Sequence, residues 1–278
     1  DNTYLSYNTV VGNVLDKELY LAFEVLEYAL LNAPGAPLKK ALIDAGIGKD
    51  IMGSYDNGIY QPIFSIIAKN ANEEQKEEFL SVIRNVLEDC VKNGISKKSL
   101  LAGINSMEFK FREADFGAYP KGLMYGLQCL DSWLYDEKEP FMHIEAIETY
   151  AFLKEQTKGR YFEELVQKYL LDNTHVSVVI TKPQKGLNAE NEKALEEKLA
   201  AYKAMLSKEE IDSLIADTRH LKEYQEEPSP KEDLEKIPLL KREDLKKDIV
   251  KLTNEECEVA GVPALYHDVF TSGIHYVD

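Results

Sequence analysis

The chain has 278 residues, of which 44% are hydrophobic and 29% charged, a composition typical of a soluble globular protein with one large or two modest domains. It carries 33 Lys and Arg against 49 Asp and Glu, which gives a net charge of −16. This balance argues against binding to nucleic acid or to an anionic membrane, because both need clustered cations. No apolar run approaches the ~18 residues of a membrane span. We therefore expect neither nucleic-acid nor membrane partners.

Cysteine usage and the first residue indicate where the chain comes from. Cys90, Cys129 and Cys257 are odd in number, far apart and form no CxxC, which favours a reducing compartment. We expect the cytoplasm, although an organelle matrix would look much the same. The chain opens with Asp1 and has no basic-then-apolar leader, so we expect a piece of a longer protein.

The first part of the chain alternates strand and helix signals. Residues 3–11 are β-branched and aromatic and predict a strand that Gly12 ends. Asp16 is the predicted N-cap of a helix that stops before Asn32, with one apolar face formed by Leu19, Phe23, Leu26 and Leu30. A short helix over 38–45 follows.

Asn57-Gly58 lies between two β-rich runs and predicts a hairpin with a tight turn. The second arm is expected over 59–68. Pro62 falls inside this arm and cannot donate to a ladder, so we expect it at an edge or a bulge.

Helical signals dominate the next hundred residues. Asn72 and Gln75 predict a capping box for a long helix that Gly94 ends, with Phe79, Ile83, Val86, Leu87 and Cys90 facing inward. More helices are expected over 96–171, and then a strand over 175–181 that Pro183 ends. The predicted fold class for residues 1–186 is α+β, with a largely antiparallel sheet covered by helices.

Residues 187–254 are densely charged and predict a long antiparallel helical hairpin. The first arm has a stripe of Leu195, Leu199, Tyr202 and Leu206. Ser207 and Glu210 predict a capping box for the second arm, whose stripe is Ile211, Leu214, Ile215, Thr218 and Leu221. Each arm of ~18 residues would span ~27 Å. Pro228 ends the second arm, and a short helix is expected to begin with Pro230 at its first position.

Residues 255–278 are expected to be the first strands of a following domain. The predicted strands cover 258–262 and 268–277. The second strand reaches the end of the chain, so we expect the parent chain to continue.

Catalytic motifs are absent from the sequence. No two of the five histidines, at 143, 175, 220, 267 and 275, are three to five residues apart, so neither H-E-x-x-H nor H-x-x-E-H occurs. There is no G-x-S-x-G, and Cys90 on an apolar helix face is expected to be buried and inert. Residues 46–49 resemble a phosphate loop only superficially and predict a turn into a strand. We predict no catalytic residue and no metal ligand, and substrate-binding residues stay unassigned.

Adjacent acidic residues are common, and they are expected to be solvated. Neighbours on a helix point ~100° apart and cannot share a site as a general acid and base. The pairs are 73–74, 77–78, 196–197, 209–210 and 226–227.

Several stretches together resemble the presequence-protease branch of the insulinase-like (pitrilysin-type) zinc metallopeptidases. They are residues 35–48, 61–66, 104–113, 121–123, 133–135, 161–165, 171–175, 181–183 and 237–244. The resemblance covers nearly the whole chain in order. Family members are described as four similar α/β domains in two halves that enclose a chamber for unfolded peptides. The zinc motif H-x-x-E-H with a distal glutamate belongs to the first domain.

The resemblance implies that this chain is the second, non-catalytic domain, the helical linker and the start of the third domain. No zinc ligand or general base carries over, and Tyr60 and Arg112 inherit no role. The parent would be a zinc metalloendopeptidase, whereas this chain alone is expected to be inactive. Its implied partners are the rest of its own polypeptide and, in the parent, unstructured peptide substrates. Residues 1–186 would form part of the chamber wall, and the hairpin would be the hinge between halves.

Two other interpretations remain open. The chain could be a self-standing structural protein of the same fold, which would use its surface for assembly. It could also be an enzyme whose scattered site the sequence does not reveal, in which case groups with perturbed pKa values would cluster in a cleft.

Overall fold

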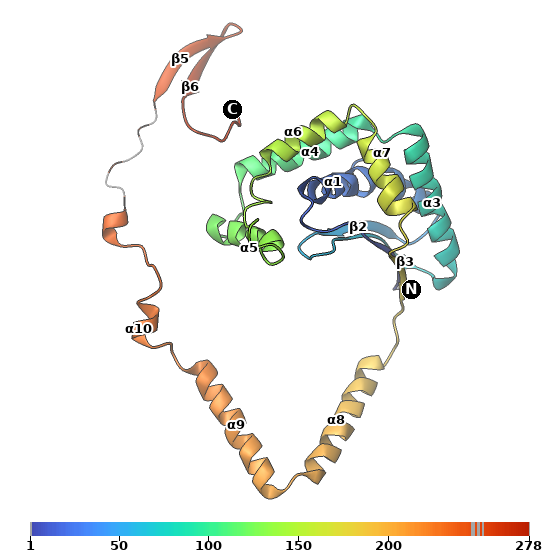
Figure 1. Ribbon diagram of the computed structural model, residues 1–278, viewed down its shortest axis with the longest axis vertical. Coiled ribbons are helices and arrows are strands. Elements are labelled where there is room, and N and C mark those ends of the chain that lie inside the picture. Colours follow the sequence, from blue (N-terminus) through green and yellow to red (C-terminus); the bar gives the residue numbers. More distant parts are fainter. Residues whose placement is uncertain (1, 246–247, 249–250, 252, 278) are drawn as a thin grey trace. The chain divides into compact units, whose positions relative to one another are not determined.

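Four antiparallel strands form a sheet in the order β2-β3-β1-β4 (Figure 1). They are β1 (Thr3–Val10), β2 (Asp50–Asp56), β3 (Ile63–Ala71) and β4 (Val176–Thr181). β1 pairs with β3 on one side and with β4 on the other, so segments far apart in the sequence meet in one sheet. The predicted α+β class with an antiparallel sheet is confirmed.

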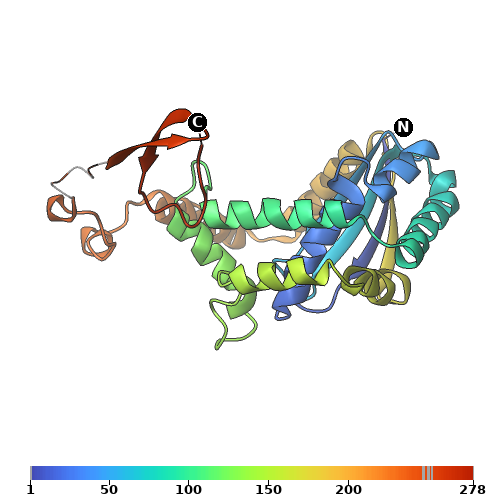
Figure 2. The same cartoon turned by 90° about the horizontal axis from the view of Figure 1, so that it is seen from above.

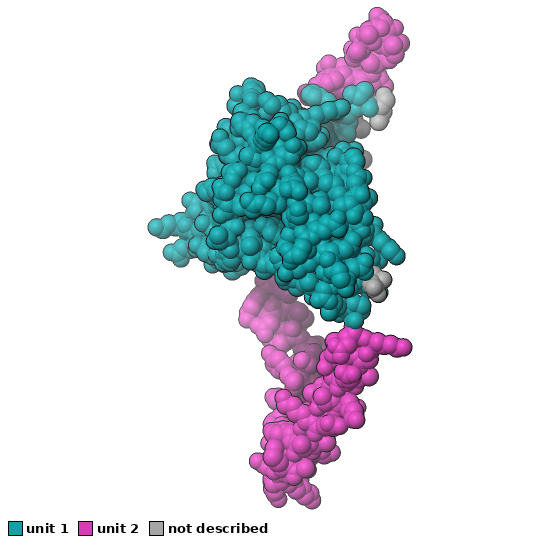
Figure 3. Space-filling view, turned by 90° about the vertical axis from the view of Figure 1, so that its right-hand side faces the viewer, with its two compact units in different colours: residues 1–183, 270–278 teal, residues 184–269 magenta. Residues whose placement is uncertain are grey.

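The computed structural model describes residues 2–245, 248, 251 and 253–277. The chain divides into two units, 1–183 with 270–278 and 184–269, which Figure 3 colours separately. The expected boundary at 186–187 lies within a few residues of this division, and the three expected domains stay a prediction. Within the described ranges, no helix combines the length and the apolar character that crossing a bilayer requires.

Helices cover one face of the sheet, where alternate strand residues are apolar and buried: Leu5, Ile51, Phe64, Ile66 and Ala68. The innermost helix is α1, which Phe23 anchors. The Phe23 ring meets the rings of Phe64 and Tyr169 edge-on, with centroids 5.8 Å apart in each case. The other helices are arranged around α1 and along the sheet.

The outer helices form a second layer. α4 and α6 lie side by side and pack against α1 (Figure 2). α3 packs against α2 and α7. The bounds are α1 Lys17–Glu27 with a π-helical turn Tyr28–Asn32, α2 Pro37–Asp44, a 3₁₀ turn Glu73–Gln75, α3 Lys76–Asn93, α4 Lys97–Glu113, α5 Lys121–Trp133, α6 Ile147–Gln156, and α7 Tyr161–Val166 with a π-helical turn Gln167–Leu171.

The predicted helix caps are confirmed. Asp16 accepts a hydrogen bond from the Leu19 N–H at 2.9 Å, and the Asn72 N–H donates to Gln75 Oε1 at 3.1 Å. Gly94 ends α3 with φ at +94°. Four of the five residues expected on the inner face of α3 are buried, while Val86 is half-buried.

The β2–β3 hairpin exists, but its predicted tight turn is wrong. The connection runs over residues 57–62, and neither Asn57 nor Gly58 has the positive φ that a two-residue turn needs. Tertiary bonds hold the longer loop, since the N–H groups of Val11 and Val14 donate to the carbonyls of Pro62 and Tyr60 at 2.8 and 3.0 Å. Pro62 therefore lies just before β3, outside the ladder, and β3 is an inner strand.

Two long helices with charged surfaces begin the second unit. α8 (Leu187–Met205) and α9 (Lys208–Glu226) diverge from a short connection at Leu206 and Ser207 (Figure 1). A capping box at Ser207 and Glu210 opens α9, as predicted. Neither helix has a buried residue. α10 (Lys231–Leu234) follows, with Pro230 as its N-cap and not at its first position, and then a 3₁₀ turn, Arg242–Asp244.

The strands expected near the end of the chain are displaced. β5 (Asn254–Val259) and β6 (Val262–His267) pair through a turn in which Ala260 and Gly261 have φ of +52° and +82°. Residues 268–277 are not a strand, because Ser272 and Gly273 also have positive φ, at +53° and +80°. This segment belongs largely to the first unit, where the Ser272 carbonyl accepts from Arg112 at 3.3 Å.

Candidate functional site

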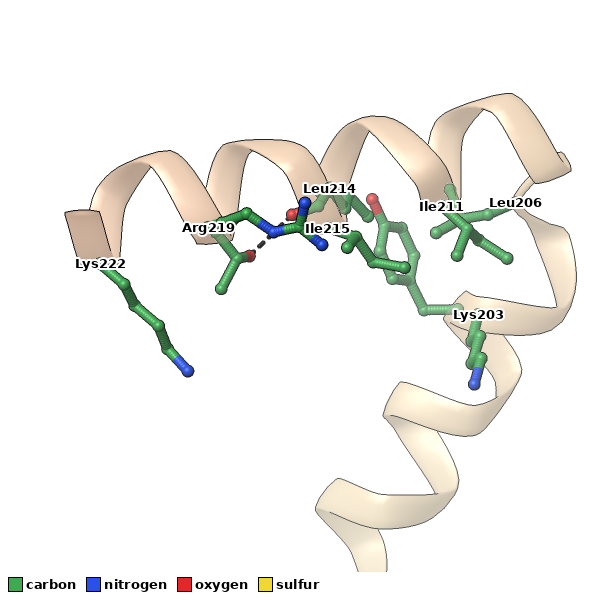
Figure 4. A pocket seen from close by; sticks show the side chains of 9 residues that line it. Lys203, Leu206, Ile211, Leu214, Ile215, Arg219 and Lys222 are labelled. Atoms are coloured by element: carbon green, nitrogen blue, oxygen red, sulfur yellow. Dashed lines mark hydrogen bonds between the residues drawn. The ribbon is translucent and has the colours of Figure 1, made fainter. Parts of the chain in front are cut away.

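The α8–α9 connection creates an apolar concavity of about 610 Å³, which we call the corner groove (Figure 4). Its floor is apolar and its rim carries three cations. The floor residues are Tyr202, Leu206, Ile211, Leu214 and Ile215, and the cations are Lys203, Arg219 and Lys222. Thr218 completes the lining and donates its hydroxyl to the Leu214 carbonyl at 2.7 Å.

The capping box sets the geometry of this corner. The Ser207 N–H donates to Glu210 Oε2 at 2.8 Å, and the Glu210 N–H donates to Ser207 Oγ at 3.2 Å. The hydrogen bonds from Ser207 lower the pKa of Glu210. The box therefore starts α9 at Lys208 and separates the two arms after a connection of only two residues.

The stripes extend beyond the corner groove and stay open to solvent. Leu195 and Leu199 are each 55% exposed, and Leu214 is 47% exposed. Two amphipathic helices that expose a continuous apolar stripe are typical of a surface that contacts another protein segment. The stripes predicted for both arms are thus present, and within the described residues of this unit they cover each other only near the connection.

A second concavity, of about 600 Å³, lies over α1 in the first unit, and we call it the α1 pocket. It is lined from four helices and one loop: Glu24 from α1; Met107, Lys110, Phe111 and Glu113 from α4; Asp115 and Phe116 from the loop; Tyr125 and Gln128 from α5; and Tyr150 from α6. Two aromatic pairs stand in its wall. The ring centroids are 5.7 Å apart for Phe111 and Tyr150 and 5.6 Å for Phe116 and Tyr125.

Glu24 is the most perturbed acid of the α1 pocket. Burial raises the pKa of Glu24 to about 7, and the carboxylates of Glu27 and Asp131 act in the same direction. The hydrogen bond from Asn57 Nδ2 to Glu24 Oε1, 2.8 Å long, opposes this rise. Asn57 belongs to the β2–β3 connection, which explains why that loop is longer than a tight turn.

A polar cluster fastens α5 to α1 beside the pocket. The Tyr20 hydroxyl donates to Asp131 Oδ2 at 3.0 Å, and the His143 ring stacks on Tyr20 with centroids 3.8 Å apart. Burial lowers the pKa of His143 to about 4, so the imidazole is neutral at physiological pH. Buried and stacked, His143 serves here as a packing residue.

The residues weighed as chemical candidates lie apart from one another. In the part of the chain that the structure describes, no three His, Cys, Asp or Glu side chains form a group that could hold a metal ion. These residues therefore do not fit a zinc site. Cys90 is buried, as predicted, and burial raises its pKa to about 11. Residues 46–49 form the predicted turn into β2, and the paired acidic residues are exposed.

Sequence reasoning missed the α1 pocket, although α1 carried a signal for it. Tyr20, Glu24 and Glu27 stand at i, i+4 and i+7 on a helix whose other positions are mostly buried and apolar. Polar side chains in a line on such a helix need partners from another element. Those partners, Asn57 and Asp131, are too remote in sequence for a local pattern to reveal.

Comparison with known proteins places both units in one family. Residues 1–107 match the family model described as Peptidase M16 inactive domain, and residues 181–278 match the model of the region associated with M16 peptidases of subfamily C. The chain consists of an M16 inactive domain and its associated region. The resemblance to presequence-protease-like metallopeptidases is thereby confirmed.

The relatives of this M16 inactive domain are much longer proteins. Protein HypA of Clostridium perfringens is 43% identical over 99% of this chain, and presequence protease 1 of Arabidopsis thaliana is 30% identical over 95%. The chain spans 28% and 25% of these two relatives, about a quarter of their length. The mitochondrial presequence protease of Danio rerio is 24% identical over 98% of the chain.

A solved structure shares the fold. The crystal structure of a proposed zinc protease from Bordetella pertussis Tohama I superposes with a TM-score of 0.53 at 10% identity, covering 66% of this chain and 94% of that chain. At this identity the likeness concerns the fold alone.

Proposed function

We propose that this chain is the non-catalytic domain and the hinge linker of a longer zinc-dependent oligopeptidase that degrades unfolded peptides in a closed chamber. The observation that carries the proposal is the continuous apolar stripe on α8 and α9, helices without a buried residue. Zinc would be held by ligands outside this chain. The chain alone would be inactive, and its partners would be the rest of its polypeptide and, in the whole enzyme, unstructured peptides.

The stripe supports a linker role on energetic grounds. Burying one Leu or Ile side chain contributes about 1.5–3 kcal/mol, and both arms leave such side chains near half exposed. A surface of this kind is stable in water when another part of the polypeptide covers it. Two arms that meet at one short connection suit a hinge that lets two rigid bodies open and close.

The names of the relatives support the peptidase part of the proposal. Several are presequence proteases, and the family models are those of a peptidase family. We propose a cytoplasmic location or an organelle matrix, which the chloroplastic and mitochondrial names of relatives make reasonable.

The double substitution Leu199→Asp with Leu214→Asp tests the hinge. In the longer polypeptide it places two charges on the stripe, so we expect slower turnover of an unstructured fluorogenic peptide. Bound zinc, measured by metal analysis, should stay at the wild-type level because the metal ligands lie outside this chain.

A matched control places the same charges on the opposite faces of the arms, as Ala204→Asp with Ala216→Asp. Both alanines are exposed, and the helical spacing sets them away from the stripes. The control should hydrolyse the peptide at the wild-type rate. Unchanged turnover in the stripe variant would reject the hinge role.

A further inference from the structure

The α1 pocket has an excess of negative charge on its wall. Glu24, Glu113 and Asp115 contribute three carboxylates, and Lys110 is the one cationic side chain among the described residues that line it. Lys110 is exposed, which places its ammonium group toward solvent. The other cations near this end of α4 are already engaged, since Arg112 and Lys154 both pair with Glu108.

Glu24 lacks a cationic partner within the described part of the chain. Its recorded hydrogen bond is to the neutral amide of Asn57, through Oε1, and its nearest charged neighbours are the carboxylates Glu27 and Asp131. A half-buried carboxylate without a cation is unfavourable, because the lost hydration is not replaced. A positively charged ligand would supply the missing partner.

The aromatic side chains restrict which cation fits. Phe111, Phe116, Tyr125 and Tyr150 come from α4, the following loop, α5 and α6, so rings enter the wall from several directions. Aromatic faces attract cations, and a planar guanidinium both stacks on rings and binds a carboxylate through two parallel hydrogen bonds. An ammonium group is more strongly hydrated, and an anion would be repelled by the three carboxylates.

From this combination we infer that the α1 pocket binds a guanidinium group, supplied by an arginine residue of an extended peptide. The cavity, the uncompensated carboxylate of Glu24 and the aromatic wall all belong to the first unit. The inference goes beyond the proposed linker role. It holds or fails on the chain by itself, whether or not the longer polypeptide is a peptidase.

Calorimetric or NMR titration of the 278-residue chain tests the inference. The probe is acetyl-Gly-Gly-Arg-Gly-Gly-amide, and its matched partner carries citrulline, which keeps the shape of arginine but is neutral. At about pH 8, where a carboxyl group with a pKa of about 7 is mostly ionised, the arginine peptide should bind at least about tenfold more tightly.

Glu24→Gln should reduce this preference to less than about threefold, because the amide keeps the shape of the side chain and loses the charge. Glu27→Gln is the matched control. It removes a carboxylate from the same helix at a position outside the pocket lining, so the preference should persist. Circular dichroism of each variant establishes that it is folded.

Tyr125→Leu tests the aromatic wall independently of charge, since Tyr125 is half-buried on α5 and lines the pocket. It should weaken binding of the arginine peptide by about threefold to tenfold. Tyr119→Leu, at an exposed position outside the lining, should bind like the wild type. Equal affinity for the two peptides, or an undiminished preference in folded Glu24→Gln, would overturn the inference.

Discussion

At the scale of single residues, Glu24 connects the fold to the pocket. Its carboxylate accepts a hydrogen bond from Asn57, a residue 33 positions away in the β2–β3 connection. The sequence places Glu24 on α1, beside the apolar stripe, but says nothing about Asn57 as its partner. The pair forms only after the sheet has brought the connection over α1, so the acid's environment depends on tertiary structure.

Glu24→Gln is expected to stabilise the folded chain at high pH. Burial raises the Glu24 pKa from its ordinary value near 4.5 to about 7, so between these values the folded state holds the proton more tightly than the unfolded state. Stability due to Glu24 therefore falls as the pH rises through this window. The variant should gain on the order of 2 kcal/mol in unfolding free energy relative to the wild type at pH 8, and much less at pH 4.

Urea denaturation at both pH values measures this difference. Glu78 on α3 is exposed, so Glu78→Gln is a suitable control and should follow the wild type. A gain of the same size at pH 4 and pH 8 would contradict the assignment, because the benefit would then not come from ionisation.

At the scale of elements, caps followed their local signals, while turns followed the tertiary structure. The boxes at Asn72 and Ser207 formed as the sequence indicated, because each needs only residues within one turn. Asn57-Gly58 did not form a tight turn, because Asn57 and the backbone around it bond to α1 and to the segment after β1. The β5–β6 turn was missed because Ala260 carries no common signal for positive φ.

Ser207→Ala is expected to weaken the start of α9. The variant loses the acceptor for the Glu210 N–H, which typically costs about 1 kcal/mol of helix stability. Amide hydrogen exchange in the first turn of α9 should become about fivefold faster, since local opening sets the rate there. Ser213→Ala, an exposed interior position of the same helix, should not accelerate exchange. Equal acceleration in both variants would mean that the box does not hold the helix start.

At the scale of the whole molecule, the two units differ in how they satisfy their apolar residues. The first unit buries Phe23, Phe64, Phe79 and Phe162 in one core, whereas α8 and α9 leave their stripes open. A core that is complete and a stripe that is not belong to a domain with an attached linker. The linker's counterpart would lie in the longer polypeptide that we propose.

The proposal predicts how zinc and activity divide between segments. The purified chain should bind no zinc and should leave an unstructured fluorogenic peptide intact. Adding the separately expressed upstream segment, which would carry the metal ligands, should produce zinc-dependent cleavage above that of the upstream segment alone. Stoichiometric zinc or chelator-sensitive cleavage by the chain alone would contradict the scaffold role.

The sequence by itself determined the α+β class, the helices and their caps, and the stripes of α8 and α9, because periodicity and capping act within a few residues. The three-dimensional structure decided the β2–β3 and β5–β6 turns, the course of residues 268–277 and the α1 pocket. These depend on contacts between remote segments, such as Glu24 with Asn57 and Arg112 with the Ser272 carbonyl, 160 positions apart. Local patterns carry no information on such pairs, since only the packed sheet and helices bring them together.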